Sequence, residues 1–175
     1  MAICARDFAA AEDILSKSSN EEVWFLGAPI PRRILALWLE LIEGNHPTIE
    51  EFGAAREQLY QKVQAEPSDP YFLASLALAD VALGRKEEAV QEGRRAMALR
   101  PISEDAFDGP DVAMLVAEVY ALTDQPDAAF AQLNILVKIP CAVLNYGELK
   151  TNPAWDPLRQ DPRFDKLLAE LAPRD

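Results

Sequence analysis

The sequence predicts an all-α protein built from a repeated pair of helices, and three observations support this class. Half of the 175 residues are hydrophobic, which is enough for a sizeable core. A pattern of 34 residues recurs, since Ala55 precedes Ala89 by this interval and Pro67 precedes Pro101 by the same one. Thirteen prolines outnumber seven glycines, as expected where prolines mark regular helix boundaries. We therefore expect one domain of stacked helix pairs over residues 1–175.

The beginning of the chain contains half of a repeat. Residues 6–20 have the pattern of a second helix, although only a handful of residues precede them. A matching first helix is therefore missing, and we expect a partly uncovered face that carries Phe8, Ile14 and Leu15. This pattern indicates a C-terminal fragment of a longer chain. Complete coverage of Phe8 by its own chain would count against that interpretation.

A degenerate repeat is expected next, at residues 31–67. Its first helix is predicted to run from Arg32 to Glu43, and extra residues from Asn45 to Glu50 connect it to the second helix. This insertion departs from the 34-residue pattern, so the register of the repeat stays open.

Two regular copies follow at residues 70–103 and 110–140. In each copy an apolar first helix leads through a tight turn to a second helix that ends near a proline. The turns are predicted at Leu83-Gly84-Arg85 and Thr123-Asp124-Gln125, and Pro126 opens the second helix of the later copy. Each pair needs neighbours, because one helical hairpin cannot bury its apolar faces alone.

An acidic loop separates the two copies. Glu104 to Gly109 are six residues in excess of the repeat, and they place Phe107 among three acids. The loop is either a contact finger or a solvated connection whose aromatic ring folds back onto the helices. We expect the second arrangement, because it is commoner for insertions of this length.

The last residues, 141–173, have the pattern of a capping segment. A short amphipathic helix is predicted from Cys141 to Leu149, and the proline-rich run from Asn152 to Pro157 predicts a turn or a single helical coil. The final helix begins with Asp161 as its N-cap and Pro162 as its first residue. Trp155 and Phe164 are expected to seal the terminal repeat.

The repeat resembles the tetratricopeptide repeat, and residues 70–103 carry the best match. Its first helix reads Leu73-x2-Leu76-Ala77-x2-Asp80, and Ala89, Ala96 and Pro101 follow at the family's positions. Asp80 replaces the usual tyrosine and Gly93 the usual phenylalanine. The resemblance implies a right-handed superhelix of antiparallel helix pairs with C-terminal capping helices, and a concave face lined by the first helix of each pair.

A finer resemblance concerns three segments of the chain. Residues 83–89, the loop Asp108-Gly109-Pro110-Asp111 and the tail 155–164 look like the C-terminal repeats of large bacterial signalling proteins, which join such repeats to kinase, cyclase or winged-helix regulatory domains. This resemblance implies a non-catalytic docking or regulatory module that binds a protein or peptide partner. The partner is a separate protein, an adjacent domain or a second copy. The alternative is a dimerisation module without an external ligand.

The groove positions of the family fall on the first helices of the two regular copies. They are Tyr71, Ala74, Leu78, Val81 and Ala82 in one copy, and Asp111, Met114, Glu118, Ala121 and Leu122 in the next. The same spacing is compatible with simple packing between helices. Tyr71 and Glu118 are the preferred candidates, because aromatic residues anchor interfaces and an acid selects a basic partner. Trp38 either contributes to the groove or belongs to the core.

The sequence offers little for catalysis. His46 lies in a loop without ligands at metal spacing, and Cys4 and Cys141 fit neither a disulfide framework nor a metal site. Cys141 would need an activated thiol to support an enzymatic alternative. No phosphate-binding, nucleophile-elbow or zinc motif is present. We therefore predict no enzyme, no cofactor and no metal.

The charge excludes further classes of partner. Seventeen basic residues against twenty-nine acidic ones leave a formal charge of −12, which disfavours nucleic acids and anionic membranes. No run approaches the ~20 apolar residues of a membrane span, and the N-terminus lacks the pattern of a signal peptide. A cytoplasmic location is expected.

Overall fold

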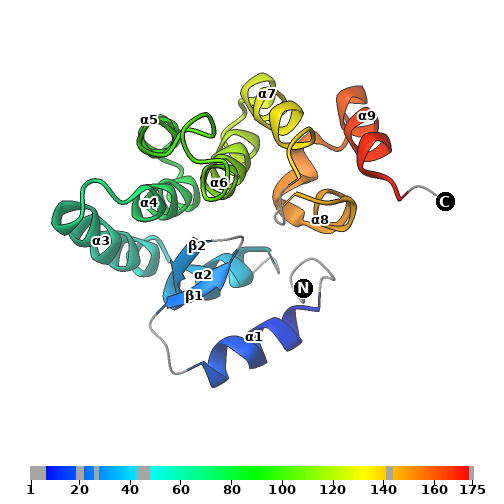
Figure 1. Ribbon diagram of the computed structural model, residues 1–175. Coiled ribbons are helices and arrows are strands. Elements are labelled where there is room, and N and C mark those ends of the chain that lie inside the picture. The colour runs from blue at the N-terminus through cyan, green and yellow to red at the C-terminus, as the bar shows by residue number, and fades with distance from the viewer. Residues whose placement is uncertain (1–6, 19–21, 26–27, 43–47, 141–143, 174–175) are drawn as a thin grey trace.

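The computed structural model describes residues 7–18, 22–25, 28–42, 48–140 and 144–173, and it is mostly helical (Figure 1). The predicted all-α class is confirmed at this level. The helices are α1 (Phe8–Lys17), α2 (Arg32–Ile42), α3 (Ile49–Ala65), α4 (Pro70–Ala82), α5 (Lys86–Leu99), α6 (Gly109–Leu122), α7 (Pro126–Leu136), α8 (Tyr146–Thr151), the 3₁₀ helix η1 (Pro153–Leu158) and α9 (Pro162–Leu171).

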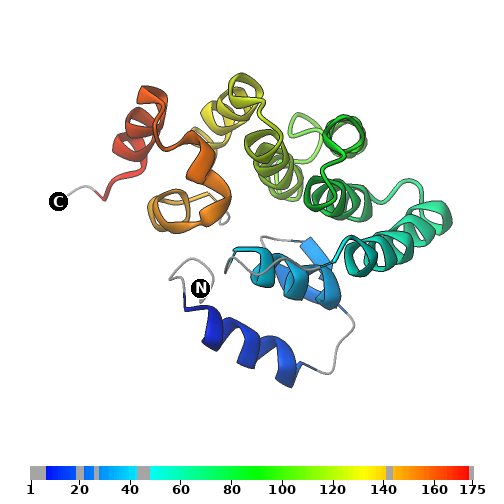
Figure 2. The same ribbon diagram turned by 180° about the vertical axis from the view of Figure 1, so that it is seen from behind.

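The helices from α3 to α9 follow one another around a curve. Both views place α2 and a small β-hairpin on the inner side of this curve, facing α4 and α6, whereas α5 and α7 lie on the outer side (Figures 1 and 2). The apolar helices α4 and α6 are therefore covered on several sides, and most of their residues are buried. None of the described helices combines the length and apolar character needed to cross a bilayer.

The β-hairpin was not predicted from the sequence. Strand β1 (Glu22–Phe25) pairs antiparallel with β2 (Ala28–Pro31), with Val23 opposite Ile30. Ile30 is buried, and β2 packs against α4. A two-stranded hairpin is marginal alone, so this contact with the helices stabilises it.

The two regular copies contain the same tight turn. Gly84 adopts a φ of +72° and Asp124 a φ of 58°. The N–H of the following residue, Arg85 or Gln125, donates to a carbonyl five residues earlier, at distances of 2.8 and 2.9 Å. This bond satisfies a free carbonyl at the helix end. The turns predicted at 83–85 and 123–125 are thus confirmed.

The second helix of the degenerate repeat begins earlier than predicted. The Thr48 hydroxyl caps α3 by accepting a hydrogen bond from the N–H of Glu51, and the Glu51 carboxylate in turn accepts one from the N–H of Thr48. This capping box fixes the start of the helix at Ile49. The predicted insertion from Asn45 to Glu50 therefore ends at Thr48.

The capping segment agrees with the prediction at its end and differs at its beginning. Asp161 accepts a hydrogen bond from the N–H of Arg163, and Pro162 is the first residue of α9, as predicted. The run from Asn152 to Pro157 is mostly the 3₁₀ helix η1, and Trp155 and Phe164 are buried. Of the residues 141–149 predicted to form a helix, 141–143 lie outside the described residues. The helix observed next is α8, Tyr146–Thr151, which begins after Asn145 because the Asn145 side chain accepts a hydrogen bond from the Glu148 N–H.

The loop after α5 does not fold its aromatic ring back, so that prediction is wrong. Phe107 is 88% exposed. The loop is ordered by polar bonds instead. The Asp105 carboxylate accepts hydrogen bonds from the N–H groups of Phe107 and Asp108, and the Arg100 guanidinium pairs with the carboxylates of Asp105 and Asp108.

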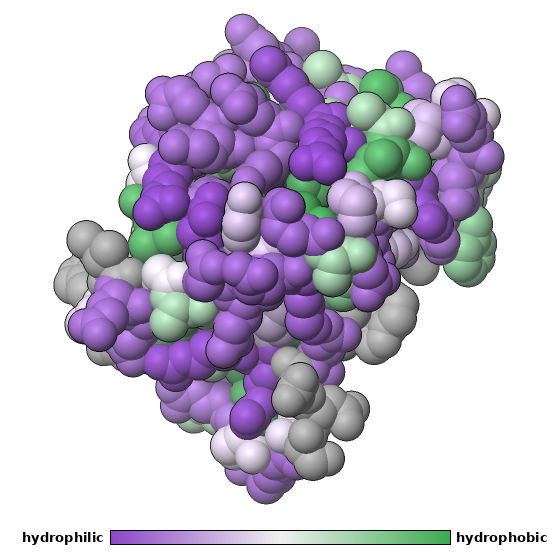
Figure 3. Space-filling model, turned by 90° about the vertical axis from the view of Figure 1, so that its left-hand side faces the viewer, coloured by the Kyte–Doolittle hydropathy of each residue, from purple (hydrophilic) through white to green (hydrophobic). Residues whose placement is uncertain are grey.

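The face seen in Figure 3 is mostly hydrophilic, with hydrophobic residues in small separate groups.

Several predicted positions lie outside the described residues. They are Cys4, His46 and Cys141, together with the side chain of Phe8. On the same helix as Phe8, Ile14 is 60% exposed whereas Leu15 is buried.

A close approach of α5 and α6 explains the glycine at position 93. A Cβ at Gly93 would lie 3.1 Å from Cγ1 of Val116, which is tighter than ordinary contact. The phenylalanine typical of the repeat family has no room at this position.

Substitution Gly93→Phe is therefore expected to destabilise the chain by about 1–3 kcal/mol or more, because overpacking forces the two helices apart. The matched control is Gly53→Phe, because no atom lies within 4 Å of a Cβ at Gly53. Urea denaturation of both variants measures the difference. Equal stabilities would show that α5 and α6 can move apart to accept the ring without loss of stability.

Candidate functional site: a cavity on the inner face

The ten predicted groove residues do not form one site. Ala74, Met114 and Ala121 are buried and have no open surface to offer. Val81 and Ala82 are partly buried and pack against the core. The remaining residues fall into two separate groups, which are Tyr71 with Asp111, and Leu78 with Glu118 and Leu122.

Tyr71 and Asp111 lie at the N-terminal ends of α4 and α6, beside the loop that carries Phe107. The guanidinium of Arg100 lies 5.9 Å from the centroid of the Tyr71 ring. Burial, followed by the charges of Asp108 and Asp111, raises the pKa of Tyr71 to about 12. Tyr71 is therefore a neutral phenol that partly covers Arg100. It precedes Leu78 by about two helical turns, or about 10 Å along the axis.

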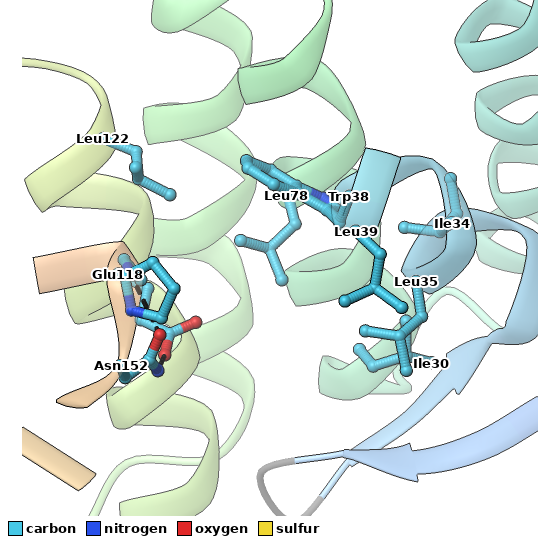
Figure 4. A pocket seen from close by; sticks show the side chains of 11 residues that line it. Ile30, Ile34, Leu35, Trp38, Leu39, Leu78, Glu118, Leu122 and Asn152 are labelled. Carbon is cyan, nitrogen blue, oxygen red and sulfur yellow. Dashed lines mark hydrogen bonds between the residues drawn. The ribbon is translucent and has the colours of Figure 1, made fainter. Parts of the chain in front are cut away.

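Leu78, Glu118 and Leu122 line a cavity of about 80 Å³ on the inner side of the curve (Figure 4). The opposite wall comes from the hairpin and α2, which contribute Ile30, Ile34, Leu35, Trp38 and Leu39. Asn152, Pro153 and Ala154 close one end. Leu78, Glu118 and Leu122 were among the predicted groove residues, and Trp38 was a candidate. The other lining residues were not predicted, because they come from segments at least 30 positions away in the chain.

The cavity wall includes one carboxyl group among the described residues that line it, that of Glu118. Asn152 Nδ2 donates to Glu118 Oε1 at 2.8 Å and to Oε1 of the buried Glu148 at 2.7 Å. The indole Nε1 of Trp155 also donates to Glu148, at 3.1 Å. One amide thus bridges two buried carboxyl groups and connects α6 to the capping segment.

The environment of Glu118 favours its neutral form. Burial is the largest cause of a pKa well above the ordinary value, and the charge of Glu148 adds to it. The hydrogen bond from Asn152 acts in the opposite direction and does not compensate. The cavity wall therefore favours the neutral form of this carboxyl group over its ionised form.

The raised pKa of Glu118 predicts a stability that falls as pH rises. The folded chain binds a proton at Glu118 that the unfolded chain releases near the ordinary pKa, so the stabilisation is complete below that pH and is lost as pH rises toward the folded pKa. Glu92 has the same sign, with a pKa raised to about 8 by burial and by Asp80. A tenfold difference in proton affinity between the folded and unfolded chains changes the free energy of unfolding by about 1.4 kcal/mol.

We expect Glu118→Gln to match the original chain in stability at pH 5 and to exceed it increasingly up to pH 8. The amide accepts the bond from Asn152 without carrying a charge. Urea midpoints at four pH values measure the effect, and Glu92→Gln provides the comparison at the second site. Parallel curves for Glu118→Gln and the original chain would contradict the assignment to Glu118.

Trp38 adds a second polar group to the cavity wall. Its indole Nε1 is buried and has no hydrogen-bond partner among the described residues. Such a donor costs free energy unless an acceptor meets it. The apolar wall around it supplies no acceptor.

The described residues contain no cluster of three side chains suited to hold a metal ion. Comparison with known proteins adds no assignment: no protein-family model matches the chain, and neither a curated protein nor a solved structure matches it at a significant level.

Proposed function

We propose that the chain is a tetratricopeptide-like array that acts as a non-catalytic scaffold for protein–protein interaction, as a docking or regulatory module of a larger bacterial signalling protein. The observation that supports this proposal best is the cavity on the inner side of the curve, lined by Leu78, Glu118 and Leu122 of α4 and α6. These residues occupy positions at which such arrays receive a partner segment.

The size of the cavity limits what a partner inserts there. The hairpin and α2 occupy much of the inner face, and the remaining space of about 80 Å³ is too small for a helix. A partner would therefore place one side chain in the cavity and rest its backbone at the rim. This is the arrangement of an anchor residue at an interface.

Filling the cavity tests this function. The immobilised chain captures proteins from a lysate of the source cells, and Leu122→Trp is expected to abolish the specific capture because the indole occupies the cavity. The matched control is Ile135→Trp on α7, where the original side chain is 45% exposed. Circular dichroism verifies that both variants keep their helices. Identical capture by both variants would place the interaction elsewhere.

The alternative is a module that dimerises the parent protein without an external ligand. It predicts a mass that doubles with concentration in sedimentation equilibrium, together with no specific capture. A constant monomer mass excludes this alternative. A cytoplasmic location agrees with both functions and is tested by fractionating the source cells.

A further inference from the structure

The cavity on the inner face contains two polar groups with unused hydrogen-bonding capacity. Within the described part of the chain, Glu118 accepts a bond from Asn152 at Oε1 and none at Oε2. The Nε1 of Trp38 has no acceptor there. Glu118 Oε2 and the Trp38 N–H therefore both line one small cavity, and each would gain a partner from an incoming group.

The rest of the wall is apolar. Isoleucine, leucine and proline side chains surround the space between Trp38 and Glu118 (Figure 4). The volume of about 80 Å³ is roughly half that of an engineered 150 Å³ cavity known to bind benzene. It accepts the end of one unbranched side chain.

Charge selects among such side chains. None of the described residues that line the cavity is basic, and the whole chain carries a formal charge of −12. A cationic group is therefore attracted at long range and meets Glu118 at the end of its path, where Oε2 accepts no hydrogen bond within the described part of the chain. A neutral side chain would form no ion pair with Glu118.

We propose that this cavity binds the ammonium group of a lysine side chain presented by a partner protein, with the Glu118 carboxylate as its counter-ion. The inference rests on the proposed scaffold function and specifies its anchor residue. The methylene groups of the lysine lie along the leucine side chains, and a peptide carbonyl next to the lysine accepts from Trp38 Nε1.

Lysine fits this cavity better than arginine. A guanidinium pairs best with both oxygens of a carboxylate, and Asn152 already occupies Oε1 of Glu118. A compact ammonium group needs only the second oxygen. The aromatic face of Trp38 offers a further contact to a cation.

Binding changes the protonation of Glu118 in a defined way. The raised pKa favours the neutral carboxyl group in the free chain; on binding, this form releases its proton to solvent and becomes the carboxylate of the ion pair, while the ammonium group keeps its three protons. Glu148 of α8 and Asn152 are the other polar groups that face Glu118. Glu148 stays in place, bonded to Asn152 and Trp155.

A lysine blocked at both ends, N-acetyl-lysine N-methylamide, is the probe. Nuclear magnetic resonance of the full chain, labelled with ¹³C and ¹⁵N, follows the Glu118 carboxyl carbon and the Trp38 indole N–H during a titration at pH 6.5. Both signals are expected to shift with one saturable curve, and the carboxyl carbon moves toward its ionised position. Blocked norleucine, which has no charge, is expected to bind at least tenfold more weakly, and blocked arginine lies between them.

Two variants make the result decisive. Glu118→Gln is expected to lose at least tenfold in affinity for blocked lysine and to bind blocked norleucine as before, whereas Leu122→Trp is expected to bind neither. Equal affinities for lysine and norleucine overturn the lysine inference and leave an apolar anchor site, so the scaffold function stands. A lysine preference that survives Glu118→Gln, or no binding of either probe, also overturns it. The scaffold function is tested separately by capture: it fails if the original chain captures no protein specifically, and undiminished capture by Leu122→Trp places the interaction outside this cavity.

Discussion

Replacing Arg56 with methionine is expected to lower the free energy of unfolding by about 3–5 kcal/mol, the cost of breaking a buried ion pair. Arg56 on α3 donates to both carboxylate oxygens of Asp80 on α4, at 2.6 and 2.9 Å. Asp80 is fully buried. Without the guanidinium, its charge keeps the longer and half-exposed contact with Arg85, at 3.9 Å.

The pair also connects three consecutive helices. Glu92 of α5 lies 3.9 Å from the Arg56 guanidinium, and hydrogen bonding to Asp80 holds the pKa of Arg56 above its ordinary value. The contact therefore couples the degenerate repeat to the first regular copy. In an array whose stability depends on neighbouring units, such a coupling affects more than one pair of helices.

Two controls separate this effect from general loss of a surface charge. Arg33→Met removes an exposed ion pair with Glu51 and is expected to cost less than about 1 kcal/mol. The double variant Arg56→Met with Asp80→Leu is expected to recover much of the loss, because the buried charge of Asp80 is then absent as well. Urea denaturation measures all three. A loss below about 1 kcal/mol for Arg56→Met would show that the pair contributes little.

Trp155→Ala is expected to have an effect of similar size, about 3–5 kcal/mol. Among the described residues, Trp155 has the largest fully buried side chain, and η1 packs against α6. Removing the indole leaves a void and takes one donor away from Glu148. The damage is expected at the C-terminal end of the array first.

Amide hydrogen exchange locates this damage. The amides of α8 and α9 are expected to lose protection in Trp155→Ala, whereas those of α4 and α5 keep most of theirs. Trp155→Phe is the matched control: it removes the hydrogen bond to Glu148 but retains an aromatic ring and most of the volume, so a smaller loss is expected. Uniform loss of protection along the chain would contradict a local capping role.

Local sequence patterns predicted most helix ends correctly. Each of the turns at 83–85 and 123–125 depends on one residue of positive φ and on a hydrogen bond between residues five positions apart, so neighbouring amino acids decide both turns. The start of α9 depends on Asp161 and Pro162 alone. These features need no information from distant segments.

The predicted groove was not obtained correctly from such local patterns. The spacing in α4 and α6 marks one apolar surface but does not say which positions another segment covers. Met114 and Glu118 share that spacing and are both buried, yet Glu118 lines the cavity and Met114 does not. The difference comes from the hairpin, α2 and η1, whose positions depend on contacts between segments far apart in the chain.

The sequence by itself determined the helical class, the paired helices of the two regular copies and the position of their turns, because periodicity and capping act within a few residues. Only the tertiary structure decided that the hairpin and α2 cover the inner face, that Arg56 reaches Asp80, and that Asn152 joins Glu118 to Glu148. These arrangements depend on how segments distant in the chain pack, and no local preference encodes that packing.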